Sequence, residues 1–188
     1  MYFHSLTDSG ACAAGDLGLD RLKADLGSAA RTPSFSYIVP DRCHDGNPTP
    51  CAAGAAAGMG PADSFLGKVV PEITGSRAYH EGGLLVITVD EAPSTGEFGD
   101  SSSCCGQPGF PNLPASGATG QLPRGGGTVG ALLISRYVKG ATTTQEQFNH
   151  FSLLRTIEDL FSLKHLGYAA LPSVKALPPS LFTASPSG

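Results

Sequence analysis

The chain has 188 residues, a formal net charge of −4 and only 15% charged residues. This length suffices for one domain with a sizeable core, and the absence of a basic stripe argues against a nucleic-acid partner. No apolar run approaches the ~18 residues that a membrane span needs. The first ten residues, MYFHSLTDSG, lack the basic and apolar regions of a signal peptide.

The first half of the chain predicts two helices, a strand and a long loop. Residues 17–29 carry leucines near helical spacing, and residues 34–40 (SFSYIVP) predict a strand that ends at Pro40. Residues 41–60, dense in Gly, Pro and Ala, predict a long loop. Residues 61–76 predict a helix that Pro71 bends or interrupts. Its apolar stripe consists of Phe65, Leu66, Val69, Val70 and Ile73.

The second half predicts two apolar strands and a helix. Residues 83–90 (GLLVITVD) show no polar alternation, which favours a strand covered on both faces, and 128–135 predict another strand. Residues 148–163 predict a helix with Asn149 as N-cap. Its expected buried face consists of His150, Leu153, Leu154, Ile157, Leu160 and Phe161. The order predicts an α/β fold with a small sheet, a domain over 1–170, and a Pro-rich tail over 171–188 that wraps the surface or frays.

The five cysteines lie mostly in loops, as in exported proteins. Cys43 and Cys51 flank a short loop and are expected to lie close enough to form a disulfide. Cys104 and Cys105 are adjacent, Cys12 stands alone, and the odd count leaves at least one without a partner in this chain. No C-x-x-C pair supports a zinc ribbon. Exported character without a signal peptide suggests that an N-terminal part is missing.

Three places carry residues suited to chemistry. Asp90 and Glu91 end the strand 83–90, and two adjacent carboxylates are favourable there beside a divalent cation or a basic group. The alternative is a solvated strand end at which Asp90 starts a turn. His44 and Asp45, together with Asp41, follow the strand 34–39, with an Asx-turn at Asp45-Gly46 as the alternative. His150 begins a helix, where a structural role is the more common one.

Two further patterns predict no site. The glycines of RGGGTVG (124–130) precede a strand instead of linking a strand to a helix, unlike a phosphate-binding loop. The serines of GDSSSCC (99–105) lack the strand-to-helix turn of a nucleophilic serine, and no other serine or threonine has a nucleophile's context.

Four segments, in this order, resemble the bacterial phosphoesterase family: PSFSYIVPDRCHDG, PADSFLGKVVPEITGSRAYHEGGLLVITVDEAP, GGGTVGALLISRYVKGATT and FNHFSLLRTIEDLFSL. This family contains acid phosphatases and phospholipases C related to alkaline phosphatase. The resemblance implies an alkaline-phosphatase-like α/β sandwich with a mostly parallel sheet. It also implies hydrolysis of phosphomonoesters or phosphodiesters with a divalent metal, on a phosphate-ester small molecule or a phospholipid headgroup, in a secreted or cell-envelope protein.

The resemblance also implies roles for individual residues. Asp90 and Glu91 match the metal-binding pair, His44 and Asp45 match residues near the phosphate, and His150 falls on the family's final helix. Many relatives read Asn-Asp-Gly-His where this chain reads His44-Asp45-Gly46-Asn47. If both acidic segments leave carboxyl ends of one parallel sheet, they converge on one rim.

The family's Glu-Asn metal pair and its Ser or Thr nucleophile have no counterpart in this sequence. The chain is therefore expected to be the C-terminal half of a phosphoesterase that is inactive in isolation. The alternative is a catalytically inactive remnant that binds metal or phosphate, or packs against a partner chain supplying the other half.

Overall fold

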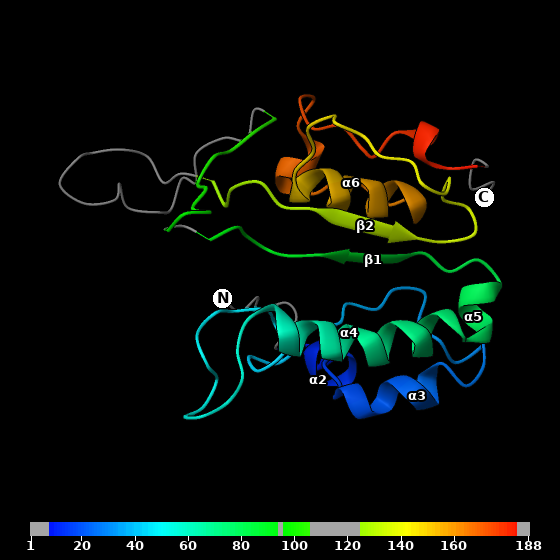
Figure 1. The fold of residues 1–188 in the computed structure, drawn as a ribbon. Helices are drawn as coiled ribbons and strands as arrows, with labels where there is room; N and C mark the ends of the chain where they lie inside the picture. The colour runs from blue at the N-terminus through cyan, green and yellow to red at the C-terminus, as the bar shows by residue number, and fades with distance from the viewer. Residues whose placement is uncertain (1–7, 94–95, 106–124, 184–188) are drawn as a thin grey trace. The chain divides into compact units, whose positions relative to one another are not determined.

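The computed structural model describes residues 8–93, 96–105 and 125–183 (Figure 1). The chain divides into two compact units, Met1–Leu85 and Val86–Gly188. Among the described residues, no helix has the length and apolarity needed to cross a bilayer.

The first unit is helical in its described part. It contains α2 (Ala11–Gly15), a 3-10 turn η1 (Leu19–Arg21), α3 (Leu22–Asp25), α4 (Met59–Thr74) and α5 (Arg77–His80). The predicted helix over 17–29 is thus reduced to the short pair η1 and α3. The predicted helix over 61–76 is confirmed as α4, in which Val69 is buried and the rest of the apolar stripe is half-buried. α4 continues past Pro71 to Thr74, so Pro71 does not interrupt it.

The predicted strand over 34–39 is wrong. Residues 34–40 belong to no strand, and Phe35, Tyr37 and Val39 are 54%, 82% and 70% exposed. Alternating apolar residues fit a strand only when a neighbouring strand pairs with their backbone. In the described part of the chain no strand pairs with this segment. The loop predicted over 41–60 is confirmed up to Gly58, after which α4 begins.

The second unit contains the sheet. β1 (Leu85–Thr88) starts at the boundary between the units and pairs with β2 (Ala131–Ile134). Figure 1 shows the two strands running in opposite directions. The helix α6 (His150–Leu160) comes after β2 in the chain. Two 3-10 turns follow, η3 (Gly167–Ala170) and η4 (Pro179–Leu181). The α/β class is confirmed, but the prediction of a mostly parallel sheet is wrong, since these strands pair antiparallel.

β1 is less covered than its sequence predicts. Its first three residues are half-buried, Thr88 is exposed, and Val89 after it is 46% exposed. A two-stranded sheet offers little area for layers on both faces, so a continuous apolar run does not imply complete burial here. The prediction that both faces of this strand are covered is therefore wrong.

α6 buries polar residues. Its buried residues are Ser152, Thr156 and Glu158, whereas Leu154, Leu160, Phe161 and His150 of the expected buried face are exposed. The cause is the following chain, which bonds to polar groups of α6. The Thr156 hydroxyl accepts from Leu177 N (2.8 Å), and Glu158 Oε1 accepts from Leu166 N (3.0 Å).

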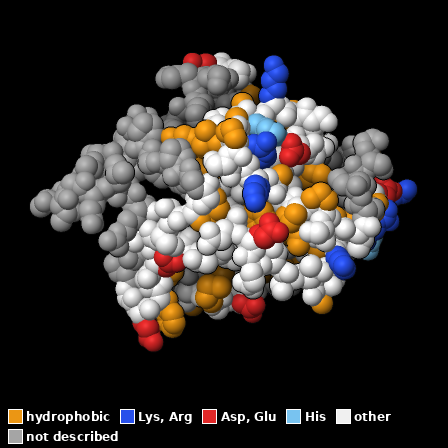
Figure 2. All heavy atoms as spheres, turned by 90° about the horizontal axis from the view of Figure 1, so that it is seen from above, with side chains coloured by type: hydrophobic (Ala, Val, Ile, Leu, Met, Phe, Trp, Pro, Cys, Tyr) orange, Lys and Arg blue, Asp and Glu red, His pale blue; other side chains and the backbone are white. Residues whose placement is uncertain are grey.

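The apolar core is small. The buried hydrophobic residues of the described chain are Ala62 and Val69 in the first unit and Ala169 and Val174 in the second. On the face seen in Figure 2, hydrophobic side chains lie open between charged ones. The described part of each unit therefore contains only a few fully buried apolar side chains, and these are small.

Candidate functional site

The acidic pair lies directly after β1. Asp90 and Glu91 are both exposed, and the Glu91 backbone N donates to Asp90 Oδ1 at 3.0 Å. The next residue, Ala92, donates its N–H to the carbonyl of Gly126 at 2.7 Å. The acidic pair thus lies on a solvated segment that is hydrogen-bonded to the chain leading into β2. Its position at the end of a strand agrees with the prediction.

Three glycines allow that close approach. A Cβ on Gly127, whose φ is +77°, would lie 2.6 Å from the carbonyl oxygen of Asp100 and 2.7 Å from the Ala92 Cβ. A Cβ on Gly126 would lie 3.2 Å from the Glu91 Cβ. Gly126 therefore allows close packing against the acidic pair, whereas Gly125 and Gly127 allow close packing against residues 100–103 and Ala92. In the sequence, the three consecutive glycines before an apolar strand were the feature that indicated this close packing.

Asp100 is a structural residue that the sequence reasoning missed. Its Oδ1 accepts from Ser102 N and its Oδ2 accepts from Thr128 N, both at 2.8 Å. These hydrogen bonds hold the pKa of the Asp100 carboxyl well below its usual range, and those from Ser102 have a larger effect than those from Thr128. Asp100 thereby joins the loop after the acidic pair to the segment that enters β2. An aspartate two residues before a serine is the usual signal of an Asx-turn.

His150 contacts the acidic segment. Its Nε2 lies 2.9 Å from the backbone carbonyl oxygen of Asp90. Because a carbonyl only accepts, Nε2 carries the hydrogen, and a neutral His150 then has its lone pair on Nδ1. The ring is positioned by the start of α6, where Asn149 and Ser152 form a capping box. Of the predicted site residues, the structure thus brings together Asp90, Glu91 and His150.

The acidic pair fits a divalent cation only in part. Two carboxylates offer hard oxygen ligands of the kind that Mg²⁺, Ca²⁺ and Mn²⁺ prefer. The described residues, however, contain no group of three or more His, Cys, Asp or Glu side chains placed to hold a metal ion. The donor set therefore suits a cation held by two carboxylates and water, and it does not form a closed metal site.

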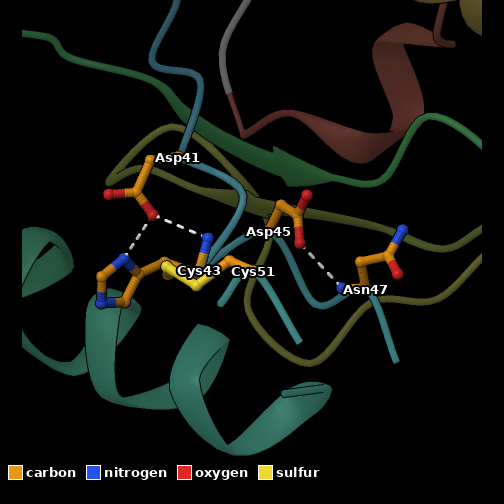
Figure 3. The surroundings of a disulfide bond; sticks show 6 residues. Asp41, Cys43, Asp45, Asn47 and Cys51 are labelled. Atoms are coloured by element: carbon orange, nitrogen blue, oxygen red, sulfur yellow. Dashed lines mark hydrogen bonds and ion pairs between the residues drawn. A yellow bond between two sulfur atoms is a disulfide. The ribbon is translucent and has the colours of Figure 1, made fainter. Parts of the chain in front are cut away.

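His44 and Asp45 lie in the first unit, in the loop before α4. Figure 3 shows this loop closed by the Cys43–Cys51 disulfide, which confirms that these two cysteines are within bonding reach, with Cα atoms 5.0 Å apart. His44 Nδ1 lies 2.6 Å from Asp41 Oδ1, and its ring lies 5.8 Å from that of Phe65 on α4. The hydrogen bond from His44, assisted by the Cys43 N–H, lowers the pKa of Asp41.

Asp45 shapes its own loop. Its Oδ1 accepts from Asn47 N at 2.8 Å (Figure 3). Asn47 Oδ1 accepts in turn from Thr49 N at 2.8 Å. Gly46 between them has φ +87°. These are Asx-turns, the alternative considered for Asp45-Gly46. The residue that pairs with His44 is Asp41, three positions before it, so the local histidine–carboxylate pair is Asp41–His44.

The sheet no longer supports the prediction that the acidic segments 41–45 and 90–91 meet at one edge. That prediction assumed that 34–39 and 83–90 are parallel strands of one sheet, and residues 34–39 form no strand. His44 and Asp45 belong to one unit and Asp90, Glu91 and His150 to the other. Their convergence stays a prediction.

The fold and site define an α/β protein with an exposed acidic strand end beside a helix-borne histidine. The model of the phosphoesterase family matches residues 5–164, most of the sequence, and the chain belongs to the phosphoesterase family. Searches of curated proteins and of solved structures gave no significant match. At the level of the family, the chain is thus a hydrolase of the phosphoesterase type.

Proposed function

We propose that this chain contributes the carboxylate and histidine part of a metal-assisted site for phosphate-ester hydrolysis. The observation that carries the proposal is the 2.9 Å contact between His150 Nε2 and the Asp90 carbonyl. In support of the proposal, a side chain able to transfer protons contacts the backbone of the segment that carries two exposed carboxylates, in a chain of the phosphoesterase family.

The roles follow from the chemistry of each group. Asp90 and Glu91 would hold a divalent cation, which when bound would offset the negative charge of a phosphate ester. His150, fixed through Nε2, would give or take a proton at Nδ1, close to an oxygen of the ester. The substrate class is a phosphomonoester or a phospholipid headgroup. Two disulfides support the proposal of a secreted or cell-envelope location.

A nucleophile is the missing part. No serine or threonine of the sequence has a nucleophile's context, and transfer through a covalent phosphoryl intermediate requires one. The second candidate function is therefore a catalytically inactive module that binds a cation or packs against a partner chain. The exposed apolar side chains, such as Tyr37, Leu132 and Leu166, favour this candidate.

Cation binding tests the proposed site. Titration of the purified chain with Mn²⁺, followed by calorimetry, should give a dissociation constant of about 10⁻⁴–10⁻³ M, because water supplies most ligands. Asp90→Asn and Glu91→Gln should each weaken binding about tenfold, while Glu72→Gln, which removes an exposed charge from α4, should not. Equal affinity in all four proteins would remove the metal role of the pair.

Activity tests whether the chain alone is a complete hydrolase. We expect the 188-residue chain with added divalent metal to show no turnover of an aryl phosphate. Sustained turnover that co-purifies with the chain and is lost in Asp90→Ala would show instead that it is a complete hydrolase. Turnover that Asp90→Ala leaves intact would contradict the proposed site.

A further inference from the structure

The loop that ends at Cys105 contains a disulfide between neighbouring residues. Cys104 and Cys105 are bonded to each other, and both are half-buried, so a small reagent can reach them. Cys105 has φ +67°, in the left-handed region that residues with a Cβ avoid. Neither Cys43 nor Cys51 has a positive φ. The vicinal disulfide thus holds its backbone in an unfavourable conformation, and the other disulfide does not.

The vicinal disulfide lies against the start of α6. Cys104 Sγ is 3.5 Å from the carbonyl oxygen of Phe148, two residues before the helix. A disulfide sulfur has no hydrogen to donate, whereas a thiol at this place could donate to that carbonyl. Cys105 lines a cleft of about 310 Å³ together with Ser152, the fully buried residue of the α6 capping box.

We propose that Cys104–Cys105 is a reversible thiol–disulfide site that reacts with dithiols in preference to Cys43–Cys51, and that its state is transmitted to the N-terminus of α6. In the exchange, one thiolate of the dithiol attacks one of the two sulfurs and forms a mixed disulfide. The second thiolate of the dithiol then releases the protein. Two electrons and two protons pass to Cys104 and Cys105, and the dithiol becomes a disulfide.

The preference follows from the two environments. Reduction lets Cys105 leave the left-handed region and gives the Cys104 thiol an acceptor in Phe148. The Cys43–Cys51 loop is fixed independently by the Asx hydrogen bonds of Asp41, Asp45 and Asn47. These bonds do not depend on the disulfide, so they keep the two sulfurs together and favour re-formation of the bond.

The first test is a titration of the complete, oxidised chain with dithiothreitol. Free thiols are trapped with iodoacetamide and each cysteine is quantified by peptide mass spectrometry. Cys104 and Cys105 should be half-alkylated at about a tenfold lower dithiothreitol concentration than Cys43 and Cys51, the ratio expected from relief of one left-handed residue. Equal or reversed midpoints would overturn the proposal. So would alkylation of Cys104 and Cys105 without reductant.

The second test follows α6. The imidazole resonance of His150, assigned with His150→Gln, should shift when only Cys104–Cys105 is reduced. The double variant Cys104→Ser, Cys105→Ser should show the reduced position, and Cys12→Ser, which changes an exposed free cysteine, should show the oxidised one. A resonance that stays fixed through reduction would overturn the transmission to α6. If the double variant does not fold, the His150 resonance of the unaltered chain, followed during its dithiothreitol titration, still tests the transmission to α6.

Discussion

Asn149→Ala should destabilise the second unit by removing the N-cap of α6. Asn149 Oδ1 accepts from Ser152 N at 3.0 Å, and Ser152 is fully buried. Loss of an N-cap costs about 1 kcal/mol on average. The Ser152 N–H also donates to the backbone carbonyl of residue 149 at 2.9 Å, and this bond survives the substitution. We therefore expect the free energy of unfolding to fall by about 1 kcal/mol, the average cost of a lost cap.

Asn149→Asp provides the matched control. The carboxylate keeps the acceptor and places negative charge at the positive end of α6. It replaces the Asn149 Nδ2 group, which is buried without a hydrogen-bond partner in the described structure, by an equally buried carboxylate oxygen, and this offsets part of the gain. The free energy of unfolding of this variant should therefore lie closer to that of the parent protein than to that of Asn149→Ala.

Urea unfolding followed by far-UV circular dichroism measures both variants, provided that the slope of the transition stays constant. A loss below about 0.3 kcal/mol for Asn149→Ala, well under the usual cost of a cap, would refute the reasoning that this cap fixes α6. It would also weaken the view that the cap positions the neighbouring His150.

Three further changes test other contacts. Thr156→Val should lower the free energy of unfolding by about 1–3 kcal/mol, because it leaves the Leu177 amide unpaired. Thr156→Ser keeps the hydroxyl and should lower it much less, and urea unfolding measures both variants. Asp100→Asn should destabilise the protein at neutral pH. Because folding lowers the Asp100 pKa, its contribution is complete above its unfolded pKa of about 4 and is lost as pH falls through the folded pKa, so thermal melts of the parent and Asp100→Asn should converge in acid. Replacing Cys43 and Cys51 by serine should lower stability by about 2.5 kcal/mol, the chain entropy of so short a loop, and equal urea midpoints would contradict this.

Helices α4 and α6 could be predicted because their signals are local. The apolar stripe of α4 and the Asn149 cap of α6 lie within one or two helical turns. Strand 34–39 and the direction of the sheet could not be predicted in the same way. Alternation at Phe35, Tyr37 and Val39 describes a segment suited to pairing, but the partner and its direction come from distant parts of the chain. The buried residues of α6 were mispredicted for the same reason, since the chain after the helix bonds to Thr156 and Glu158 and covers them.

In the candidate site, too, the features encoded by neighbouring residues could be predicted, and the contacts between distant residues could not. The position of Asp90 and Glu91 after a strand was evident from the run of residues before them. The contact of His150 with Asp90 joins residues 60 positions apart, and no local pattern encodes it. Asp100 looked like part of a serine-rich loop, because its role depends on the distant Thr128 amide.

The small core has a thermodynamic consequence. The heat capacity change of unfolding arises mainly from apolar surface that is dry in the folded state and hydrated in the unfolded state, typically about 12–15 cal/mol/K per residue. Side chains such as Tyr37 and Val39 are already hydrated in the folded chain and add little to this change. The heat capacity increment should therefore lie below the typical value. The enthalpy of unfolding then varies weakly with temperature, and the stability curve is shallow and broad instead of sharply domed.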